Sequence, residues 1–169
     1  MASESWVFRV NAHPDESLGH FLGRFRRANE LSHKVVAEHL GIRVEWVRDW
    51  ETPSRRRNPT PLQLIALSKL TDVDPKQLTQ MLPPEPLHLA TRLCPACYVE
   101  VPVHRSRWQS ATTNHCDRHS MPLLSACSGC GAGFRTPSLW ESDPCGICEA
   151  ARCQQCELAF SQMKSTPGS

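Results

Sequence analysis

The spacing of the cysteines is the feature that most limits how this chain can fold. The sequence has nine cysteines, all after Leu93, and eight of them form four Cys-x2-Cys pairs. The ninth, Cys116, stands at the same spacing from His119. Two thiolates separated by two residues can bind one zinc ion from a single tight turn, and a second pair further along completes a tetrahedral site. The second half of the chain is therefore expected to fold around metal ions.

The first complete ligand set is Cys94, Cys97, Cys116 and His119. Eighteen residues separate Cys97 from Cys116, which lies within the usual range for paired zinc knuckles. Four protein ligands leave no open coordination position for a substrate water. The set therefore predicts a structural zinc ion rather than a catalytic one.

A second zinc site begins at Cys127 and Cys130, and two later pairs could complete it. They are Cys145 with Cys148 and Cys153 with Cys156, and 14 and 22 residues, both outside the usual range, separate them from Cys130. We favour Cys153 and Cys156, because an apolar segment of the kind that forms a strand in zinc ribbons follows Cys156. The pair Cys145 and Cys148 remains the alternative, and pairing these two knuckles with each other leaves a cramped loop of four residues. Two zinc ions are expected in total.

Disulfides are the competing interpretation of so dense a cysteine content. The odd number of cysteines, the repeated spacing and the absence of a signal peptide favour zinc in a reducing cytoplasm. No apolar run approaches the roughly 18 residues that a membrane helix needs. With a net charge of only +2, the chain is not a generic polyanion binder. These features predict a soluble cytoplasmic protein without membrane contact.

The first 82 residues contain no cysteine and must form their own core. Residues 1–13 are expected to form an arm, whose apolar run Trp6–Val10 is either an edge strand or an anchor for a partner through Trp6 and Phe8. A helix is predicted to start at Pro14–Ser17. Its buried stripe consists of Leu18, Phe21, Leu22, Phe25 and Ala28. Three arginines outside that stripe predict a basic outer face, either solvated or in contact with a partner: Arg24, Arg26 and Arg27.

Ser32 caps the next predicted helix, Gly41 ends it, and a third helix follows at Val44–Glu51. Helix, tight turn and helix form the helix-turn-helix pattern, and residues 32–51 resemble the Cro/repressor-like family. Val47 and Trp50 are expected to face the core, whereas Trp46 is expected to be exposed. A further helix with the stripe Leu62, Ile65, Ala66 and Leu70, and a last helix from Pro75, complete a five-helix domain over residues 14–82.

The third helix is poorly suited to reading DNA bases. The positions that would reach a base edge include Glu45 and Asp49, and acids beside phosphates weaken binding. The loop Arg55–Arg57 has the densest positive charge of the chain. Its arginines are either solvated or contact the backbone of RNA or DNA without sequence preference.

Three prolines in residues 83–92 predict a semi-rigid linker between the two halves. Zinc finger 1 is expected over residues 93–125 and zinc finger 2 over residues 126–162, followed by a disordered tail at residues 163–169. Between the knuckles of the first finger, Trp108 is expected to pack on the metal module and to leave Arg105 and Arg107 outside.

The stretch Pro14–Arg24, with Glu16-Ser17-Leu18 inside it, resembles the N-terminal signature of the TniQ/TnsD family of transposition target-selection proteins. The motifs Leu93–Cys97, Arg105–Gln109, Cys116–His119 and Cys127–Cys130 also follow the family's order. In its short length the chain is similar to the compact TniQ of type V-K CRISPR-associated transposons of cyanobacteria.

The resemblance implies a non-enzymatic adaptor between an RNA-guided Cas effector with its guide RNA and a filament of the AAA+ ATPase TnsC, with DNA bound mainly through these partners. A small-subunit ribosomal protein can belong to the same complex. The residues assigned to partner contact are Trp6, Phe8, Arg24, Arg27 and Trp46, and those assigned to nucleic acid are Arg55, Arg56 and Arg57. The alternative is a free-standing transcription regulator that binds DNA. An enzyme would need an open metal site or an activated nucleophile, and we expect neither.

Overall fold

The computed structural model describes residues 8–140 and 151–165. Within these ranges the chain is mainly helical, with isolated bridges but no strand, which confirms the predicted helical fold class. The α-helices of these ranges are α1 (Leu18–Ala28), α2 (His33–Leu40), α3 (Val44–Trp50), α4 (Pro61–Thr71), α5 (Pro75–Gln80) and α6 (Pro95–Glu100). The short 3-10 helices are η1 (Pro53–Arg55), η2 (Ser106–Gln109), η3 (Pro137–Leu139) and η4 (Phe160–Gln162).

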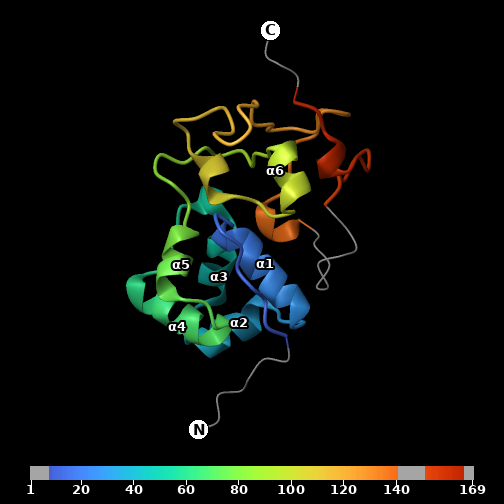
Figure 1. Ribbon diagram of the computed structural model, residues 1–169. Helices are drawn as coiled ribbons and strands as arrows, with labels where there is room; N and C mark the ends of the chain where they lie inside the picture. The colour runs from blue at the N-terminus through green and yellow to red at the C-terminus, as the bar shows by residue number, and fades with distance from the viewer. Residues whose placement is uncertain (1–7, 141–150, 166–169) are drawn as a thin grey trace.

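Helices α1 to α5 form the lower half of the molecule in Figure 1 and enclose one apolar core. Side-chain caps define where these helices start: Ser32 accepts from the Val35 amide, and Thr60 forms a reciprocal capping box with Gln63. Gly41 ends α2 in the left-handed conformation, with a φ of 64°. Val47 and Trp50 are buried in this core, as predicted.

Helix α1 begins later than the sequence predicted. Ser17 is its cap and accepts from the His20 amide, whereas Pro14 and Asp15 lie in a turn before it. Asp15 has a φ of 62°, a conformation that cannot continue into a helix. Of the predicted stripe, the four residues up to Phe25 are buried, and Ala28 at the end of the helix is partly exposed.

The buried face of α4 was predicted only in part, because Leu70 packs against the helical core but Leu62 and Ile65 do not. Leu64 and Leu67 are buried, while Leu62 is 78% exposed and Ile65 is 46% exposed. Five of the seven residues from Leu62 to Ser68 are apolar, so more than one helical stripe can be drawn through this segment. Packing against the other helices selects the stripe, and periodicity alone does not.

The second half forms a separate core around the cysteines, which Figure 1 shows above the helices. Tyr98, Trp140 and Phe160 meet edge to face at its centre, with centroid distances of 5.8 Å from Tyr98 to Trp140 and 4.8 Å from Trp140 to Phe160. Trp108 is buried in the same core, as predicted. The apolar residues after Cys156 form no strand, and only a bridge joins Arg152 to Ala159.

Residues 83–92, predicted as an extended linker, pack along the second half. Leu87 forms a bridge with Ser110, and Arg92 is buried with hydrogen bonds from its guanidinium to the carbonyls of Trp108, Ser110 and Thr113. A buried guanidinium with carbonyl partners fixes the path of the chain. The segment is therefore part of the folded structure.

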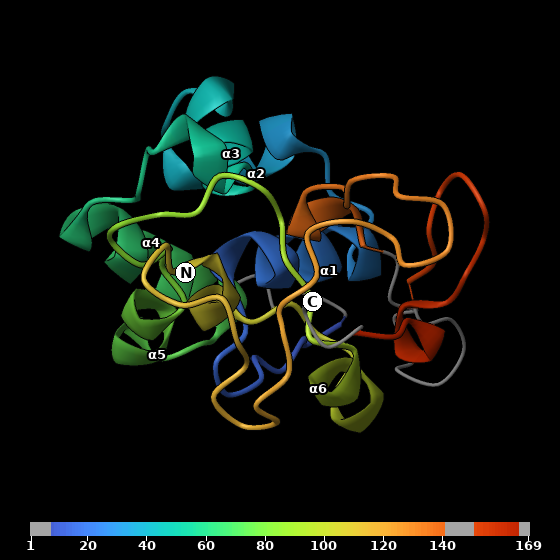
Figure 2. The ribbon, with the colours of Figure 1, turned by 90° about the horizontal axis from the view of Figure 1, so that it is seen from above.

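Helix α1 lies against both halves, as the view from above in Figure 2 shows. Arg27 donates to the carbonyls of Ser138 and Trp140, at 2.5 and 2.7 Å. Arg24 pairs with Glu16, and Arg26 pairs with Glu51. The predicted basic outer face is therefore wrong, because each of the three guanidinium groups has a partner inside the molecule.

Arg105 also differs from its prediction. It was expected outside the first metal module, but its side chain is 5% exposed and lies 3.5 Å from the Asp15 carboxylate. Arg107 is half-buried and pairs with both Asp15 and Asp117. These pairs join the turn before α1 to the knuckle that contains Cys116.

No helix in the described ranges is long and apolar enough to cross a membrane.

Candidate metal centres

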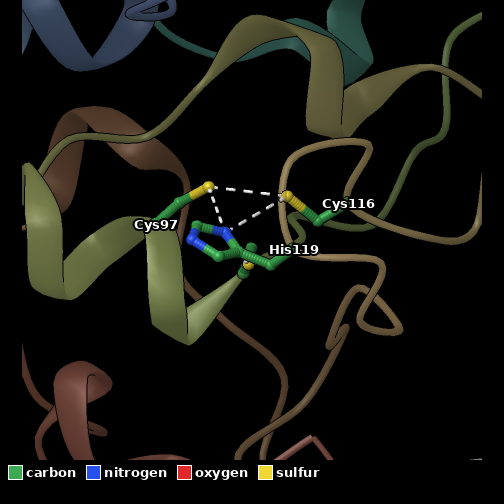
Figure 3. A group of neighbouring side chains, drawn as sticks. Cys97, Cys116 and His119 are labelled. Atoms are coloured by element: carbon green, nitrogen blue, oxygen red, sulfur yellow. Dashed lines mark hydrogen bonds between the residues drawn. The ribbon is translucent and has the colours of Figure 1, made fainter.

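The first metal cluster brings together Cys94, Cys97, Cys116 and His119, the set predicted from spacing. Cys94 caps α6, and Pro95 starts this helix so that Cys97 lies one turn later. The second knuckle is a turn in which the Ser120 amide donates to the Cys116 carbonyl at 2.7 Å. As Figure 3 shows, the imidazole of His119 faces the sulfur atoms, with Nδ1 at 3.2 Å from Cys97 and 3.8 Å from Cys116.

The thiols of this cluster differ in pKa. Burial, together with the neighbouring Cys116, raises the pKa of Cys97 to about 12. Burial also raises the pKa of Cys116, but hydrogen bonds from the backbone and His119 outweigh it and lower the pKa to about 7. A divalent cation would bind here by displacing thiol protons, so that its affinity depends on pH.

The second cluster brings Cys127 and Cys130 together with Cys153 and Cys156. Sulfur distances of 3.5 Å join Cys127 to Cys156 and Cys130 to Cys153. This is the pairing that we favoured over the alternative. Cys130 and Cys156 are exposed, so this cluster is closer to solvent than the first.

The alternative second pair, Cys145 and Cys148, is not required by this cluster. Cys153 and Cys156 already complete the set of four ligands, so neither Cys145 nor Cys148 is needed to close it. Cys145 and Cys148 themselves lie outside the described residues. The spacing of the cysteines does not discriminate between the two pairs, because both loops depart from the usual length. The folded chain, however, brings Cys153 and Cys156 next to Cys127 and Cys130.

Both clusters have the composition of a closed metal site. The ligand atoms of each lie within 4.8 Å of one another, so each cluster could hold one metal ion. Three sulfurs with one imidazole nitrogen, or four sulfurs, are donor sets that suit a tetrahedral divalent ion of borderline softness. Each set fills all four positions, which leaves none for a substrate.

A buried polar network lies where α1 meets the first metal module. The Glu16 carboxylate accepts both Arg24 Nε and Nη2, at 2.8 and 2.7 Å, and contacts His20 Nδ1 at 2.5 Å. Burial raises the pKa of Glu16, but the hydrogen bonds from His20 and Arg24 outweigh it and lower the pKa to about 2. Glu16 is therefore a buried anion whose charged partner is the Arg24 guanidinium.

On the second half of the chain, the buried His104 faces this network and contacts the cap residue Ser17. Its Nδ1 lies 2.8 Å from the Ser17 hydroxyl, and its Nε2 lies 3.2 Å from Gln109 Oε1. Because the amide oxygen only accepts, Nε2 carries the proton and Nδ1 accepts from Ser17. Burial lowers the pKa of His104 to about 3, so the ring is neutral.

No role was assigned to His20 or His104 from the sequence, so this network was not predicted. One local signal was available. Glu16, His20 and Arg24 recur every four residues, a spacing that would place them on one side of the helix predicted to start at Pro14–Ser17. His104 had no such signal, since its partner Ser17 is 87 residues away.

The predicted partner-binding aromatics have different surroundings. Trp6 lies outside the described residues. Phe8 is 57% exposed, while its backbone exchanges two hydrogen bonds with the Asn29 side chain. Trp46, which was expected to be exposed, is instead half-buried and packs against the helical core, with the Arg57 guanidinium 5.5 Å from its ring.

The predicted nucleic-acid loop is partly neutralised. Arg55 and Arg57 lie 3.5 and 3.4 Å from the Asp49 carboxylate. Arg56 is exposed at the tip of the loop, with a φ of 56°. Asp49 therefore orients two of the three guanidinium groups.

Most of the chain matches a known protein family. The family model TniQ matches residues 7–123, which is more than half of the chain. The match includes the five helices, residues 83–92 and the first metal cluster, and it ends before the second cluster. The signature residues Glu16, Ser17 and Leu18 are thus the anion, the helix cap and a core side chain of the α1 junction. Among curated proteins, none matches the sequence significantly.

Proposed function

Because the chain belongs to the TniQ family of transposition proteins, we propose that it is a non-enzymatic adaptor in target selection. It bridges an RNA-guided Cas effector and its guide RNA to the AAA+ ATPase TnsC on DNA. The observation that carries this proposal is the family match, which covers the helical half, residues 83–92 and the first metal cluster, and includes Ser17 and His104 of the buried junction.

The two metal clusters support a structural role for the metal, which we propose to be zinc. A catalytic zinc keeps an open position for water, whereas each cluster offers four protein ligands. The bound ions hold surfaces in place, and the function rests on contacts of those surfaces with partners.

The arm before α1 is the surface we assign to TnsC. Phe8 projects outward from a backbone that Asn29 holds, and a fixed exposed aromatic loses little entropy on binding. Trp6 belongs to the same assignment. Arg24 and Arg27 contribute indirectly, because their guanidinium groups are engaged within the molecule and position α1.

The loop around Arg56 is the surface we assign to RNA. Arg56 is exposed, and the neighbouring Arg57 lies over Trp46. Such a loop contacts phosphates without reading bases, so binding should weaken as salt rises.

A pull-down of the purified chain with TnsC, ATP and duplex DNA tests the proposal, with bound zinc counted by native mass spectrometry. We expect co-assembly and two zinc ions per chain. Phe8→Ala should reduce TnsC retention, whereas Leu89→Ala, a control with the similar exposure of 58%, should not. Equal retention of both variants would remove the arm from the interface.

The alternative function is a transcription regulator that uses α2 and α3 on DNA. It predicts that the chain alone binds one duplex sequence tightly and does not bind TnsC. That result would overturn the adaptor proposal. The exposed acid Glu45 on α3 argues against it, since it would face the phosphates or bases.

A further inference from the structure

His119 has two ring nitrogens with different surroundings. Nδ1 faces the sulfurs of the first cluster, at distances of 3.8, 3.2 and 3.8 Å from Cys94, Cys97 and Cys116. Nε2 points away from them and lies 2.9 Å from Glu100 Oε1. Figure 3 shows the ring in this orientation. The nitrogen available to a metal is therefore Nδ1.

The carboxylate decides which nitrogen holds the proton. An ionised carboxylate only accepts hydrogen bonds, so Nε2 must donate to Glu100. A neutral imidazole with its proton on Nε2 has its lone pair on Nδ1, directed at the three sulfurs. Carboxylate–histidine pairs of this kind orient ligands and increase their basicity in metal sites.

The local sequence explains how Glu100 reaches the ring. Glu100 is the last residue of α6 and follows the ligand Cys97 by three positions, which puts both on one side of the helix. Its second oxygen lies 3.0 Å from Arg118 Nη2, and Arg118 directly precedes His119. The carboxylate is thus held between the two knuckles of the cluster.

We propose that Glu100, fixed by Arg118, is the positioning residue of the first metal cluster: it holds His119 in the tautomer whose Nδ1 binds a divalent cation such as zinc or cobalt. The proposal rests on metal binding by this cluster and is independent of the contact with TnsC. It therefore stands or falls separately from the adaptor function.

The second cluster provides an internal control. It has four cysteines and no histidine, so no residue can act there in the same way. Removing Glu100 should weaken metal binding at the first cluster and leave the second unchanged. The loss expected for an outer carboxylate is about ten- to a hundredfold in affinity, and the partial exposure of Glu100 places it near tenfold.

The experiment is a cobalt titration of the full chain, in competition with a chelator. Visible absorption separates cobalt bound by three sulfurs and one nitrogen from cobalt bound by four sulfurs. Glu100→Ala should weaken only the first type by about tenfold. Glu100→Gln, which can still accept from Nε2, should fall between Ala and the original chain. Arg118→Ala should have a smaller effect than Glu100→Ala. Glu38→Ala, an exposed acid on α2, serves as the matched control.

A nitrogen-detected NMR spectrum of the zinc-loaded chain reads the tautomer directly. We expect a proton on His119 Nε2 in the original chain and its faster exchange with solvent in Glu100→Ala. Unchanged cobalt affinity in Glu100→Ala, a proton on Nδ1, or equal weakening at both clusters would each overturn the proposal. The last outcome would show a loss of overall stability instead.

Discussion

At the scale of single residues, the junction between the two halves depends on polar side chains withdrawn from water. Glu16 is ionised because Arg24 and His20 donate to it, whereas His104 is neutral because burial disfavours its charged form. Removing one side chain from such a network leaves its former partner buried without a hydrogen bond. This lowers the free energy of unfolding by about 1–3 kcal/mol when the stranded group is neutral, and by more when it is charged. The junction therefore has little tolerance for substitution.

The neutral His104 makes stability depend on pH. Its pKa is lowered to about 3 in the folded chain from 6.5, so below pH 6.5 only the unfolded chain takes up the proton. The free energy of unfolding therefore falls as pH falls through this window. From about pH 7.5 to about 5.5 the loss from this residue is about 1.4 kcal/mol. Glu16, with a folded pKa of about 2, adds a further loss only below its ordinary pKa of 4.5.

Urea unfolding of His104→Gln at both pH values measures this contribution. The variant should lose less stability between them than the original chain, by about 1.4 kcal/mol. His115→Asn, at an exposed histidine of the same module, should keep the original pH dependence. Equal pH dependence in all three proteins would contradict a neutral buried His104.

At the scale of elements, α1 is the helix on which both halves meet, and it allows close approach through its glycines. A Cβ atom on Gly23 would lie 2.4 Å from the Ser138 carbonyl oxygen of η3. Only glycine permits this contact, since the obstacle is backbone that cannot turn aside. The same approach brings the Arg27 guanidinium to the carbonyls of Ser138 and Trp140.

Gly23→Ala should therefore destabilise the chain, although alanine ordinarily favours a helix over glycine by about 1 kcal/mol. We expect a loss of about 1–3 kcal/mol, as for other overpacked sites, and faster hydrogen exchange in η3. Gly133→Ala is the control, because nothing lies within 4 Å of a Cβ there. A more stable Gly23→Ala protein would show that η3 is not held against α1.

The two faces of α4 give a second prediction at this scale. Leu67 is fully buried, so Leu67→Ala should lower the free energy of unfolding by about 2–5 kcal/mol. Leu62 is largely exposed, so Leu62→Ala should change it by less than about 0.5 kcal/mol. Denaturant unfolding measures both. A larger loss of stability in Leu62→Ala than in Leu67→Ala would mean that α4 buries the stripe predicted from periodicity.

At the scale of the whole molecule, two cores of different kinds share one junction. The helical core consists of ordinary apolar side chains, whereas the second core includes Cys94, Cys97 and Cys116 among its buried residues. A small metal module has too little apolar surface to fold alone, so its stability comes from metal binding. The two halves should therefore respond differently to loss of metal.

Removal of metal by a strong chelator should unfold the second half and leave most of the helix content. Helices α1 to α5 belong to the cysteine-free half, and only α6 contains a metal ligand. Far-ultraviolet circular dichroism should therefore change little, while the near-ultraviolet signals of Trp108 and Trp140 are lost and return when zinc is added. Complete loss of helix on chelation would mean that the five helices need the metal half to fold.

Much of this architecture could be predicted, since some patterns are local. The knuckle spacing follows from the reach of two thiolates around one ion, and the α1 stripe up to Phe25 follows from helical periodicity. The caps Ser32 and Gly41 act on amides and carbonyls a few residues away. In each case the residues that interact are close in the chain, so the sequence by itself determined the result.

Other features were decided by the tertiary structure alone. Whether an arginine is free depends on carbonyls as distant as those of Ser138 and Trp140, more than 110 residues from Arg27. The burial of His104 depends in the same way on Ser17, and the orientation of α4 depends on the helices packed against it. These choices were settled by contacts between distant segments, because only the folded chain brings such groups close enough to exclude water and exchange hydrogen bonds.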